Sequence, residues 1–413
     1  MTLLETQGET AQKAARVLAR TGTKQKNEAL EAIAWMLEKR QEELLEANEL
    51  DMEAARTSGM SQTLLDRLEL TPARIADMAG GVRYVAALPD PVGQTVSTVR
   101  PNGLIIGQKR VPLGVIGMIY EARPNVTVDA AALCLKAGNA CILRGGKEAF
   151  HSNEALIGVL RDALEEVNLP RDCAALVRDT TRKSAEELMN LTKYLDVLIP
   201  RGGRGLIRSV VEQAKVPVIR TGEGVCHIYV DRDADLQMAC ELVYNAKCSR
   251  PAVCNALECL IVHRAVAPDF LPMAWEFLRS KNVEIRGCSE TRAILRHAVP
   301  AKNSDWDAEF GDYILAVMVV GDVDEAMDFI AQHGTGHSEA IITENYTTAQ
   351  RFLNEVDAAA VYVNASTRFT DGGEFGLGAE IGISTQKLHA RGPMGLEALT
   401  TTKYVVYGNG QVR

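Results

Sequence analysis

The hydrophobic residues in the first fifth of the chain recur at the spacing of an α-helix. Leu30, Ile33 and Leu37 fall close to a 3.6-residue period, Leu44 continues it, and charged residues occupy positions between them. A helix patterned in this way buries its apolar face and leaves its charged face in water. We therefore predict a group of packed helices over residues 10–87.

The pattern changes after these helices, first to a hairpin and then to alternating strands and helices. The Asn102-Gly103 pair lies between two extended runs within residues 96–111, which predicts a β-hairpin that turns at this pair. Short aliphatic runs then predict strands at Val115 to Tyr120, Ala140 to Leu143, Ala174 to Val177, Leu195 to Ile199 and Val216 to Ile219. The helices expected between them are Val128 to Lys136, Asn153 to Val167 and Ser184 to Leu191, the last opening with a capping box of Ser184 and Glu187. Such alternation is typical of a parallel, doubly wound α/β sheet.

A second series of strands follows the glycine-containing stretch Gly222-Glu223-Gly224, where we expect a domain boundary. The expected strands are His227 to Val230, Leu257 to Val262, Ile314 to Val320, Ala340 to Thr343 and Ala360 to Val363, with helices at Ala267 to Arg279 and Val323 to Gln332. The final residues, Thr400 to Arg413, predict one more strand, for which the pattern suggests no partner within the chain.

Composition narrows the class of protein. A chain of 413 residues with 46% hydrophobic and 24% charged residues is typical of a globular enzyme with two domains. The net charge of -9 argues against nucleic acid as a partner, because nucleic-acid binding needs a basic surface. We expect no signal peptide and no membrane span, since no apolar run reaches about 18 residues.

The cysteines indicate a reducing compartment. Nine are scattered along the chain, an odd number without any C-x-x-C pair. This usage argues against a disulfide framework and against a zinc site, so we expect no metal and a cytoplasmic location.

One of these cysteines, Cys254, has the surroundings of a nucleophile. It lies in a loop between a helix predicted over Asp235 to Tyr244 and a buried strand, and Lys247 and Arg250 lie just upstream. Positive charges and backbone N–H groups lower the pKa of a nearby thiol and favour its reactive thiolate. The alternative is a buried cysteine that acts as a small hydrophobic residue.

Two glycine clusters follow predicted strands and are candidates for a phosphate-binding site. The first is Arg144-Gly145-Gly146-Lys147, and the second is Gly202-Gly203-Arg204-Gly205, which opens a helix. Ligands in open α/β sheets lie beyond the carboxyl ends of strands, and N–H groups at a helix N-terminus favour phosphate. Arg144 and Lys147 could bind an additional phosphate, as on NADP. The alternative is that both clusters are ordinary strand-to-helix turns.

Several longer motifs occur in the order of a known family. They are Arg110 to Thr127 (RVPLGVIGMIYEARPNVT), Lys136 to Asn139 with Leu143 to Ala149, Arg250-Pro251 before Val253 to Ala256, Gly334 to Ile341 (GTGHSEAI), and Asn364 to Phe369 with Phe375 to Gly382. With these motifs the chain resembles the γ-glutamyl phosphate reductases, also called glutamate-5-semialdehyde dehydrogenases, of the aldehyde dehydrogenase superfamily. The resemblance extends over almost the whole chain.

The resemblance implies an aldehyde dehydrogenase-like α/β fold with two doubly wound parallel-sheet domains and a small β arm used in oligomers. Residues 1–224 would form the cofactor-binding domain, with the hairpin near 96–112 belonging to the arm. Residues 225–363 would form the catalytic domain, 364–399 would return to the cofactor domain, and 400–413 would add a strand to the arm.

The resemblance also implies an activity and roles for individual residues. The expected reaction is the NADPH-dependent reduction of L-glutamyl 5-phosphate to L-glutamate 5-semialdehyde and phosphate, the second step of proline biosynthesis. Cys254 matches the family's nucleophile, Glu309 the glutamate that binds the cofactor ribose, and Asn125 the asparagine that stabilises the oxyanion. Arg123 is a candidate for the substrate's phosphate or α-carboxylate.

His337 is a candidate for substrate contact, and its alternative role is to cap a turn in the Gly-Thr-Gly-His loop.

We expect a homo-oligomer that acts on a small molecule, and docking of a glutamate 5-kinase is left open. Two other functions remain open as well. One is another semialdehyde dehydrogenase of the superfamily, and the other is a non-enzymatic thiol redox sensor that uses Cys254 or Cys248.

A hydrolytic aldehyde dehydrogenase needs a general base to activate the water that attacks its thioester. Alignment on His227 and Ile228 places Arg220 at that position, and Glu223 lies three residues out of register. We therefore expect that phosphate, and not water, resolves the thioester in the oxidative direction.

Overall fold

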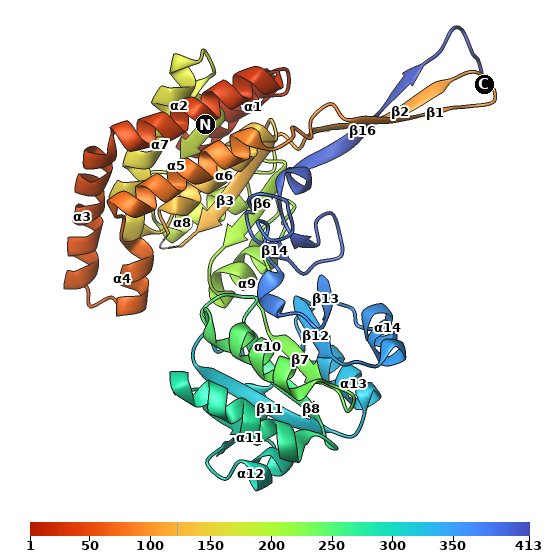
Figure 1. Cartoon of the computed structure of the whole chain (residues 1–413). Coiled ribbons are helices and arrows are strands. Elements are labelled where there is room, and N and C mark those ends of the chain that lie inside the picture. The colour runs from red at the N-terminus through yellow and green to blue at the C-terminus, as the bar shows by residue number, and fades with distance from the viewer. Residues whose placement is uncertain (122) are drawn as a thin grey trace. The chain divides into compact units, whose positions relative to one another are not determined.

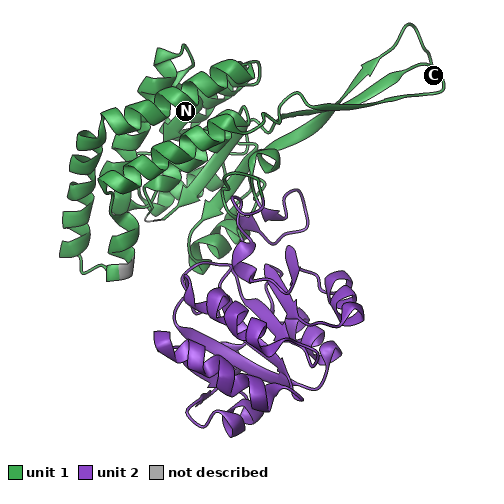
Figure 2. Ribbon diagram, in the orientation of Figure 1, with its two compact units in different colours: residues 1–221, 376–382, 394–413 green, residues 222–375, 383–393 purple. Residues whose placement is uncertain are grey.

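The structure is a computed structural model that describes residues 1–121 and 123–413. The chain divides into two compact units (Figure 2). Unit 1 comprises residues 1–221, 376–382 and 394–413, and unit 2 comprises residues 222–375 and 383–393. None of the helices in these described ranges is long and apolar enough to cross a membrane.

Unit 1 begins with the expected group of helices. They are α1 (Leu3–Leu18), α2 (Thr23–Lys39), α3 (Gln41–Thr57), α4 (Gln62–Leu68) and α5 (Pro72–Ala87). A capping box of Thr2 and Glu5 starts α1. The apolar period predicted for α2 is its buried face, where Leu30, Ile33 and Leu37 are almost fully buried. This prediction from the hydrophobic spacing is confirmed.

The sheet of unit 1 is parallel, in the order β5-β4-β3-β6. Its strands are β3 (Val115–Tyr120), β4 (Ala140–Arg144), β5 (Ala174–Leu176) and β6 (Val197–Arg201). The helices that alternate with them are α6 (Asn125–Lys136), α7 (Phe150–Glu166), α8 (Arg182–Met189) and α9 (Arg204–Gln213). Because the strands are parallel, Tyr120, Arg144 and Arg201 end neighbouring strands at one edge of the sheet.

Two local predictions for unit 1 are wrong. Residues 216–219 do not form a strand and contribute only a single bridge between Leu198 and Val218. Pro217 lacks an N–H group and cannot continue a ladder of hydrogen bonds. The predicted capping box of Ser184 is also absent: Ser184 lies inside α8, and its Oγ donates to the carbonyl of Thr181 (2.8 Å). The helix starts at Arg182, two residues before Ser184, with Thr181 as its N-cap.

Three antiparallel strands of unit 1 form a separate sheet, the arm. It consists of β1 (Thr95–Val99), β2 (Ile105–Pro112) and β16 (Thr400–Tyr407), with β2 in the centre (Figure 1). Gly103 has a φ of 86° and its N–H donates to the carbonyl of Arg100 (2.9 Å), so the hairpin turns where it was predicted. The terminal strand, for which the sequence suggested no partner, pairs along its whole length with β2.

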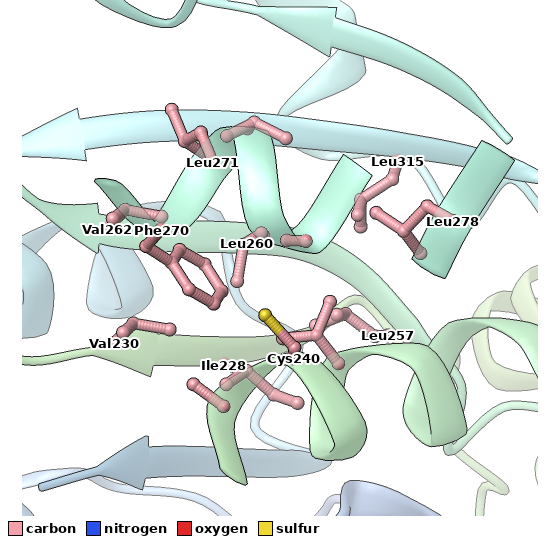
Figure 3. Close-up of a cluster of buried hydrophobic side chains, with 14 of the residues drawn as sticks. Ile228, Val230, Cys240, Leu257, Leu260, Val262, Phe270, Leu271, Leu278 and Leu315 are labelled. Carbon is pink, nitrogen blue, oxygen red and sulfur yellow. The ribbon is translucent and has the colours of Figure 1, made fainter. Parts of the chain in front are cut away.

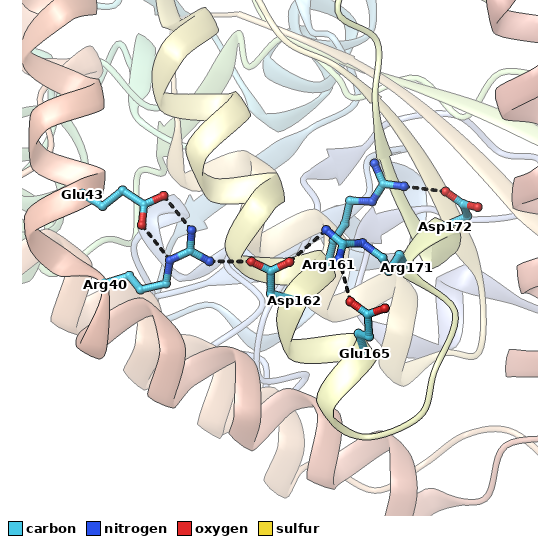
Figure 4. Close-up of polar contacts among 7 residues, drawn as sticks. All are labelled: Arg40, Glu43, Arg161, Asp162, Glu165, Arg171 and Asp172. Carbon is cyan, nitrogen blue, oxygen red and sulfur yellow. Dashed lines mark hydrogen bonds and ion pairs between the residues drawn. The ribbon is translucent and has the colours of Figure 1, made fainter.

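Ion pairs on the surface of unit 1 connect the start of α3 with α7 (Figure 4). Arg40 donates to Glu43 and, through Nη1, to Asp162 (2.7 Å). Asp162 also accepts from Arg171 (2.8 Å), which pairs in addition with Glu165 (2.6 Å). These side chains are partly exposed, so each pair contributes at most about 1 kcal/mol to stability.

Unit 2 contains a seven-stranded parallel sheet in the order β10-β9-β11-β8-β7-β12-β13. The strands are β7 (Cys226–Val230), β8 (Leu257–His263), β9 (Glu284–Gly287), β10 (Val299–Pro300), β11 (Ile314–Val320), β12 (Ser338–Ile342) and β13 (Ala360–Val363). Its helices are α10 (Leu236–Cys248), α11 (Ala267–Leu278), α12 (Ser289–Ile294), α13 (Val323–His333) and α14 (Tyr346–Glu355). A short pair, β14 (Ile383–Ser384) and β15 (Gly392–Pro393), belongs to the same unit. All five predicted strands are confirmed.

The core of unit 2 explains why its central strands are apolar on both sides. Ile228 of β7, Leu260 of β8 and Phe270 of α11 belong to one buried cluster (Figure 3). The alternate residues Tyr229 and Ile261 belong to a second cluster. A strand covered on both faces is hydrophobic along its length, as expected for a parallel sheet between helices.

Candidate active site

The cysteine predicted as the nucleophile lies at the amino end of β8. Helix α10 ends at Cys248, four residues beyond the predicted end, and Leu257 starts the strand. Cys248 is buried in the core of unit 2, whereas Cys254 in the intervening loop is partly exposed. The two thiols therefore differ in access, and Cys254 is the one that a substrate can reach.

The start of β7 fixes the backbone of Cys254 on one side. A Cβ atom placed on Gly224 would stand 1.4 Å from the Cys254 carbonyl oxygen, so only glycine permits this approach. The thiol of Cys226 donates to the same oxygen (3.2 Å). The N–H of Val225, between them, donates to Thr335 Oγ1 (3.2 Å). The residues that lead into β7 thus determine where the carbonyl of Cys254 lies.

Asn255 fixes the loop on the other side. Its buried amide donates to the carbonyls of Arg368 (3.2 Å) and Thr370 (3.0 Å). The backbone carbonyl of Asn255 accepts a hydrogen bond from Thr367 Oγ1 (2.7 Å). The segment 367–370 therefore holds the residue directly after Cys254, and Cys254 is anchored on both sides.

The cations near this loop are not the pair that the sequence indicated. Lys247 is fully buried and pairs with Glu258 (Nζ–Oε2 2.7 Å), so its charge is neutralised. Arg250 is exposed in the loop, as expected. The second cation is Arg368, which donates from Nε to Ser249 Oγ (3.2 Å) and from Nη1 to Asn255 Oδ1.

Thr367, Arg368 and Thr370 were missed because they lie more than 100 residues along the chain from the cysteine loop. The motif Asn364 to Phe369 had contributed only to the family resemblance. Its position after a predicted strand was the available signal, because the ends of parallel strands gather at one edge of a sheet.

His337 is buried, and one of its ring nitrogens faces this anchoring region. Nδ1 lies 2.8 Å from Ser338 Oγ and 3.6 Å from Cys226 Sγ, the thiol that donates to the Cys254 carbonyl. Burial lowers the pKa of His337 to about 4, so the ring is neutral at pH 7. Nε2 has no hydrogen-bond partner within the described residues. Substrate contact by His337 stays a prediction.

A chain of hydroxyl groups continues from this histidine. Ser338 Oγ lies 2.6 Å from Thr370 Oγ1, which lies 2.7 Å from the hydroxyl of Tyr362. Thr370 also offers its carbonyl to Asn255. The buried network therefore reaches the cysteine loop through Cys226, whose thiol donates to the Cys254 carbonyl, and directly at Asn255.

Glu309, predicted to bind the cofactor ribose, belongs to a loop tied to the start of β8. The N–H of Gly311 in this loop donates to Glu258 Oε1 (3.2 Å). Burial raises the pKa of Glu258 to about 7, against the lowering effect of Lys247. Charges at Glu309 and at Cys254 both raise the pKa of the Cys226 thiol, after the larger effect of burial. Glu309 and Cys254 are therefore close enough to act on one buried group.

The two glycine clusters lie at the same edge of the unit 1 sheet. Arg144 ends β4 and Arg201 ends β6, and both strands flank β3. Gly203 is the N-cap of α9, and its N–H donates to the carboxylate of Glu121 (2.9 Å). An anionic group thus already occupies this helix N-terminus, where a phosphate would also be favoured.

The cations beside the first cluster differ in their environment. Arg144 is half-buried, and its Nη2 donates to the carbonyls of Thr180 (2.7 Å) and Thr181 (3.1 Å). Burial lowers its pKa, against the charges of nearby acidic residues. Lys147 is exposed. Lys147 is therefore the freer of the two to meet a phosphate.

Asn125, predicted to stabilise the oxyanion, is the first residue of α6. Its amide donates to Asp129 Oδ2 (2.9 Å) within the same helix. Desolvation raises the pKa of Asp129 to about 6, and Asn125 and Arg201 oppose this effect. Arg123, two residues earlier, is partly buried. The roles of Asn125 and Arg123 stay predictions.

The described residues contain no group of three or more histidine, cysteine, aspartate or glutamate side chains that could hold a metal ion.

Comparisons with known proteins identify the family. The model of the aldehyde dehydrogenase family matches residues 4–285 and 294–405. A γ-glutamyl phosphate reductase from Halothermothrix orenii is 61% identical over 408 residues, which are 98% of each chain. The crystal structure of a γ-glutamyl phosphate reductase from Thermotoga maritima superimposes with a TM-score of 0.97 at 50% identity, covering 98% of this chain and 99% of that one. These matches confirm the fold class and the resemblance predicted from the motifs. The chain belongs to the aldehyde dehydrogenase family and, within it, to the γ-glutamyl phosphate reductases.

Proposed function

We propose that this oxidoreductase reduces L-glutamyl 5-phosphate to L-glutamate 5-semialdehyde and phosphate with NADPH, through a thioester on Cys254. Relatives up to 61% identical carry the name of this activity, and the family match supports a nicotinamide cofactor and a small-molecule substrate. The observation that carries the proposal is a partly exposed thiol whose backbone is fixed by Gly224 and Asn255.

The chemistry follows from this placement. The Cys254 thiolate attacks the acyl carbon, the bond from that carbon to the phosphate oxygen breaks, and its electron pair leaves with phosphate. A nicotinamide cofactor held at the unit 1 sheet edge would supply the hydride that reduces the thioester. The resulting hemithioacetal collapses to the aldehyde, and Cys254 leaves as the thiolate. Each oxyanion needs N–H donors, which we assign to the Cys254 backbone and to the Asn125 amide.

The residues at the unit 1 sheet edge fit a dinucleotide. Glycines 145 and 146 follow β4, glycines 202 and 203 follow β6, and Gly205 lies in the first turn of α9, so all five lie at the carboxyl ends of the two strands that flank β3, where nucleotides bind in sheets of this kind. Gly203 offers an N–H group that already attracts a carboxylate. We assign the extra phosphate of NADPH to Lys147 with Arg144, and the ribose to Glu309.

Water does not resolve the thioester in this proposal. Arg220 occupies the sequence position of the general base in hydrolytic relatives, and a guanidinium cannot accept a proton. Hydride therefore resolves the thioester in the forward direction, and phosphate resolves it in the reverse direction.

The test is the reverse reaction, in which glutamate 5-semialdehyde reduces NADP. We expect turnover only with phosphate or arsenate, its loss in Cys254→Ala, and its retention in the matched variant Cys248→Ala. Rapid formation of free glutamate without either anion would favour an ordinary semialdehyde dehydrogenase, with Glu223 as the first candidate base. Absence of turnover in both directions would favour a thiol sensor.

The arm supports the assignment of a homo-oligomer, because Val96, Tyr404 and Val406 expose apolar surface on it.

A glutamate 5-kinase is a further proposed partner. An acyl phosphate hydrolyses readily in water, and a docked kinase would transfer it directly to this enzyme. We place the enzyme in the cytoplasm, where a reducing environment keeps a catalytic thiol usable.

A further inference from the structure

The surroundings of Arg368 contain more positive charge than the local protein structure neutralises. Arg368 and Arg250 are close enough for the charge of Arg250 to lower the pKa of Arg368, after the larger effect of burial. Neither guanidinium forms an ion pair with a carboxylate of the described residues. Asp371, the nearby acidic residue, instead accepts the N–H of Gly373 (2.8 Å) in a turn.

The structure nevertheless holds Arg368 in a defined place. Its Nε donates to Ser249 Oγ (3.2 Å), and its Nη1 donates to Asn255 Oδ1. The carbonyl of Arg368 accepts from the Asn255 amide (3.2 Å). These bonds use two of the five N–H donors of the guanidinium, so the others remain available to a ligand. Arg368 thus contacts the cysteine loop both before and after Cys254.

We propose that Arg368 and Arg250 form the subsite for the phosphoryl group, binding the leaving phosphate of the acyl phosphate and inorganic phosphate in reverse. This inference rests on the proposed function. A planar guanidinium presents parallel donors that match two oxygens of a phosphate. Neither cation has a carboxylate partner among the described residues. Two such cations match the two negative charges of a phosphate better than the single charge of a carboxylate ligand.

The position of the subsite fits the reaction. When Cys254 attacks the acyl carbon, the phosphate is attached to that carbon through one oxygen. As this C–O bond breaks, its electron pair and the developing negative charge move onto the phosphate. Arg368, which bonds to the loop before and after Cys254, can neutralise this charge together with Arg250, and both cations favour the thiolate over the thiol.

Steady-state kinetics in the oxidative direction test the subsite. The variants are Arg250→Gln, which alters an exposed side chain, and Arg368→Lys, which keeps the charge and removes the planar fork. Arg296→Gln, an exposed arginine of the same unit, is the matched control. We expect the KM for phosphate and for arsenate to rise about 10- to 100-fold in both test variants, as loss of charge-assisted hydrogen bonds predicts. The KM for the semialdehyde should change less than about threefold.

The α-carboxylate of the substrate is the competing anion. A rise in the KM for the semialdehyde with an unchanged KM for phosphate would overturn the proposal and assign the arginines to that carboxylate. Unchanged values for both substrates would overturn it as well.

A binding measurement separates this inference from the proposed function. Inorganic phosphate should slow alkylation of Cys254 by iodoacetamide in the wild type, compared with chloride at equal ionic strength, and should do so much less in Arg250→Gln. Equal protection in both proteins would contradict the subsite. A wild type that is protected by phosphate but lacks phosphate-dependent turnover would contradict the proposed function and leave the anion subsite supported.

Discussion

The Cα atom of Gly224 lies so close to Cys254 that a methyl group on it would stand 1.4 Å from the Cys254 carbonyl oxygen. We expect Gly224→Ala to displace the loop by about 1 Å and to lower kcat/KM by about 100-fold or more, because misplaced reacting groups lose much of their rate advantage. Gly158→Ala is the control, since no atom lies within 4 Å of the added methyl group in α7 and helix propensity favours alanine by about 0.5 to 1 kcal/mol. An active Gly224→Ala enzyme would show that the loop does not depend on this approach.

His337 makes stability depend on pH in a predictable direction. Its pKa is lowered to about 4 by burial, while the unfolded chain titrates near 6.5. Between these values the unfolded state binds more protons, so stability decreases as the pH falls from about 6.5 towards 4. The full shift corresponds to about 3 kcal/mol.

Thermal melting of the wild type, His337→Gln and the exposed control His151→Gln across pH 4.5 to 7.5 measures this effect. The fall in Tm at acidic pH should be smaller in His337→Gln than in the other two proteins. Parallel curves for all three would contradict the contribution of His337.

Residues close together in sequence were easier to predict than residues that meet through the fold. Cys254 and Arg250 share a loop, and their neighbourhood was visible in the sequence. Lys247 was misjudged because its partner, Glu258, lies on the following strand. Arg368 and Cys226 lie on other elements of the sheet and contact the loop only in the folded chain, so no local spacing could identify them.

The junction between α10 and β8 depends on the buried pair of Lys247 and Glu258. Lys247→Met leaves the Glu258 carboxyl buried without a counterion, and we expect the free energy of unfolding to fall by about 3 to 5 kcal/mol. In the double variant Lys247→Met/Glu258→Leu much of this loss should be recovered, because no charge remains buried. Urea denaturation of both single variants and the double variant provides the test, and strictly additive losses would contradict the coupling.

The turn after β4 should decide the choice between NADPH and NADH. Lys147 is exposed there, whereas Arg144 also holds the carbonyls of Thr180 and Thr181. We expect Lys147→Ala to weaken NADPH binding about 10-fold and NADH binding much less, as measured by fluorescence titration. Lys183→Ala, another exposed lysine of unit 1, is the control. Equal losses for both cofactors would show that Lys147 does not contact the additional phosphate.

Strands with a uniformly hydrophobic sequence were predicted well, and strands near the edge of a sheet were not. The apolar run of β3 between Gly114 and Glu121 gave its bounds correctly. Strand β9, which lies next to the two-residue edge strand β10, mixes Glu284 and Arg286 with apolar residues, because only part of it is buried, and it was missed. The hydrophobic pattern records burial, so it detects the centre of a sheet better than its margins.

At the scale of the whole molecule, the arm is a thin sheet with apolar side chains exposed on it. Tyr404 and Val406 lie on one face of β16, opposite Gln108 and Ile106 of β2. We expect Tyr404→Lys with Val406→Lys to dissociate the proposed homo-oligomer, as measured by light scattering, because lysines buried in its interface would lose their hydration. Thr402→Lys, an exposed position nearer the root of the arm, should leave the mass unchanged. An unchanged mass in the double variant would show that the arm is not the interface.

The pairing of β16 with β2 has a consequence for synthesis on the ribosome. The central strand of the arm is complete at residue 112, but its partner begins only at Thr400. At about 5 to 20 residues per second, the nascent chain waits roughly 15 to 60 seconds with one side of β2 unpaired. During this interval the strand can pair with another nascent chain. Neighbouring ribosomes on one messenger RNA could therefore bring two incomplete subunits together before either has left the ribosome.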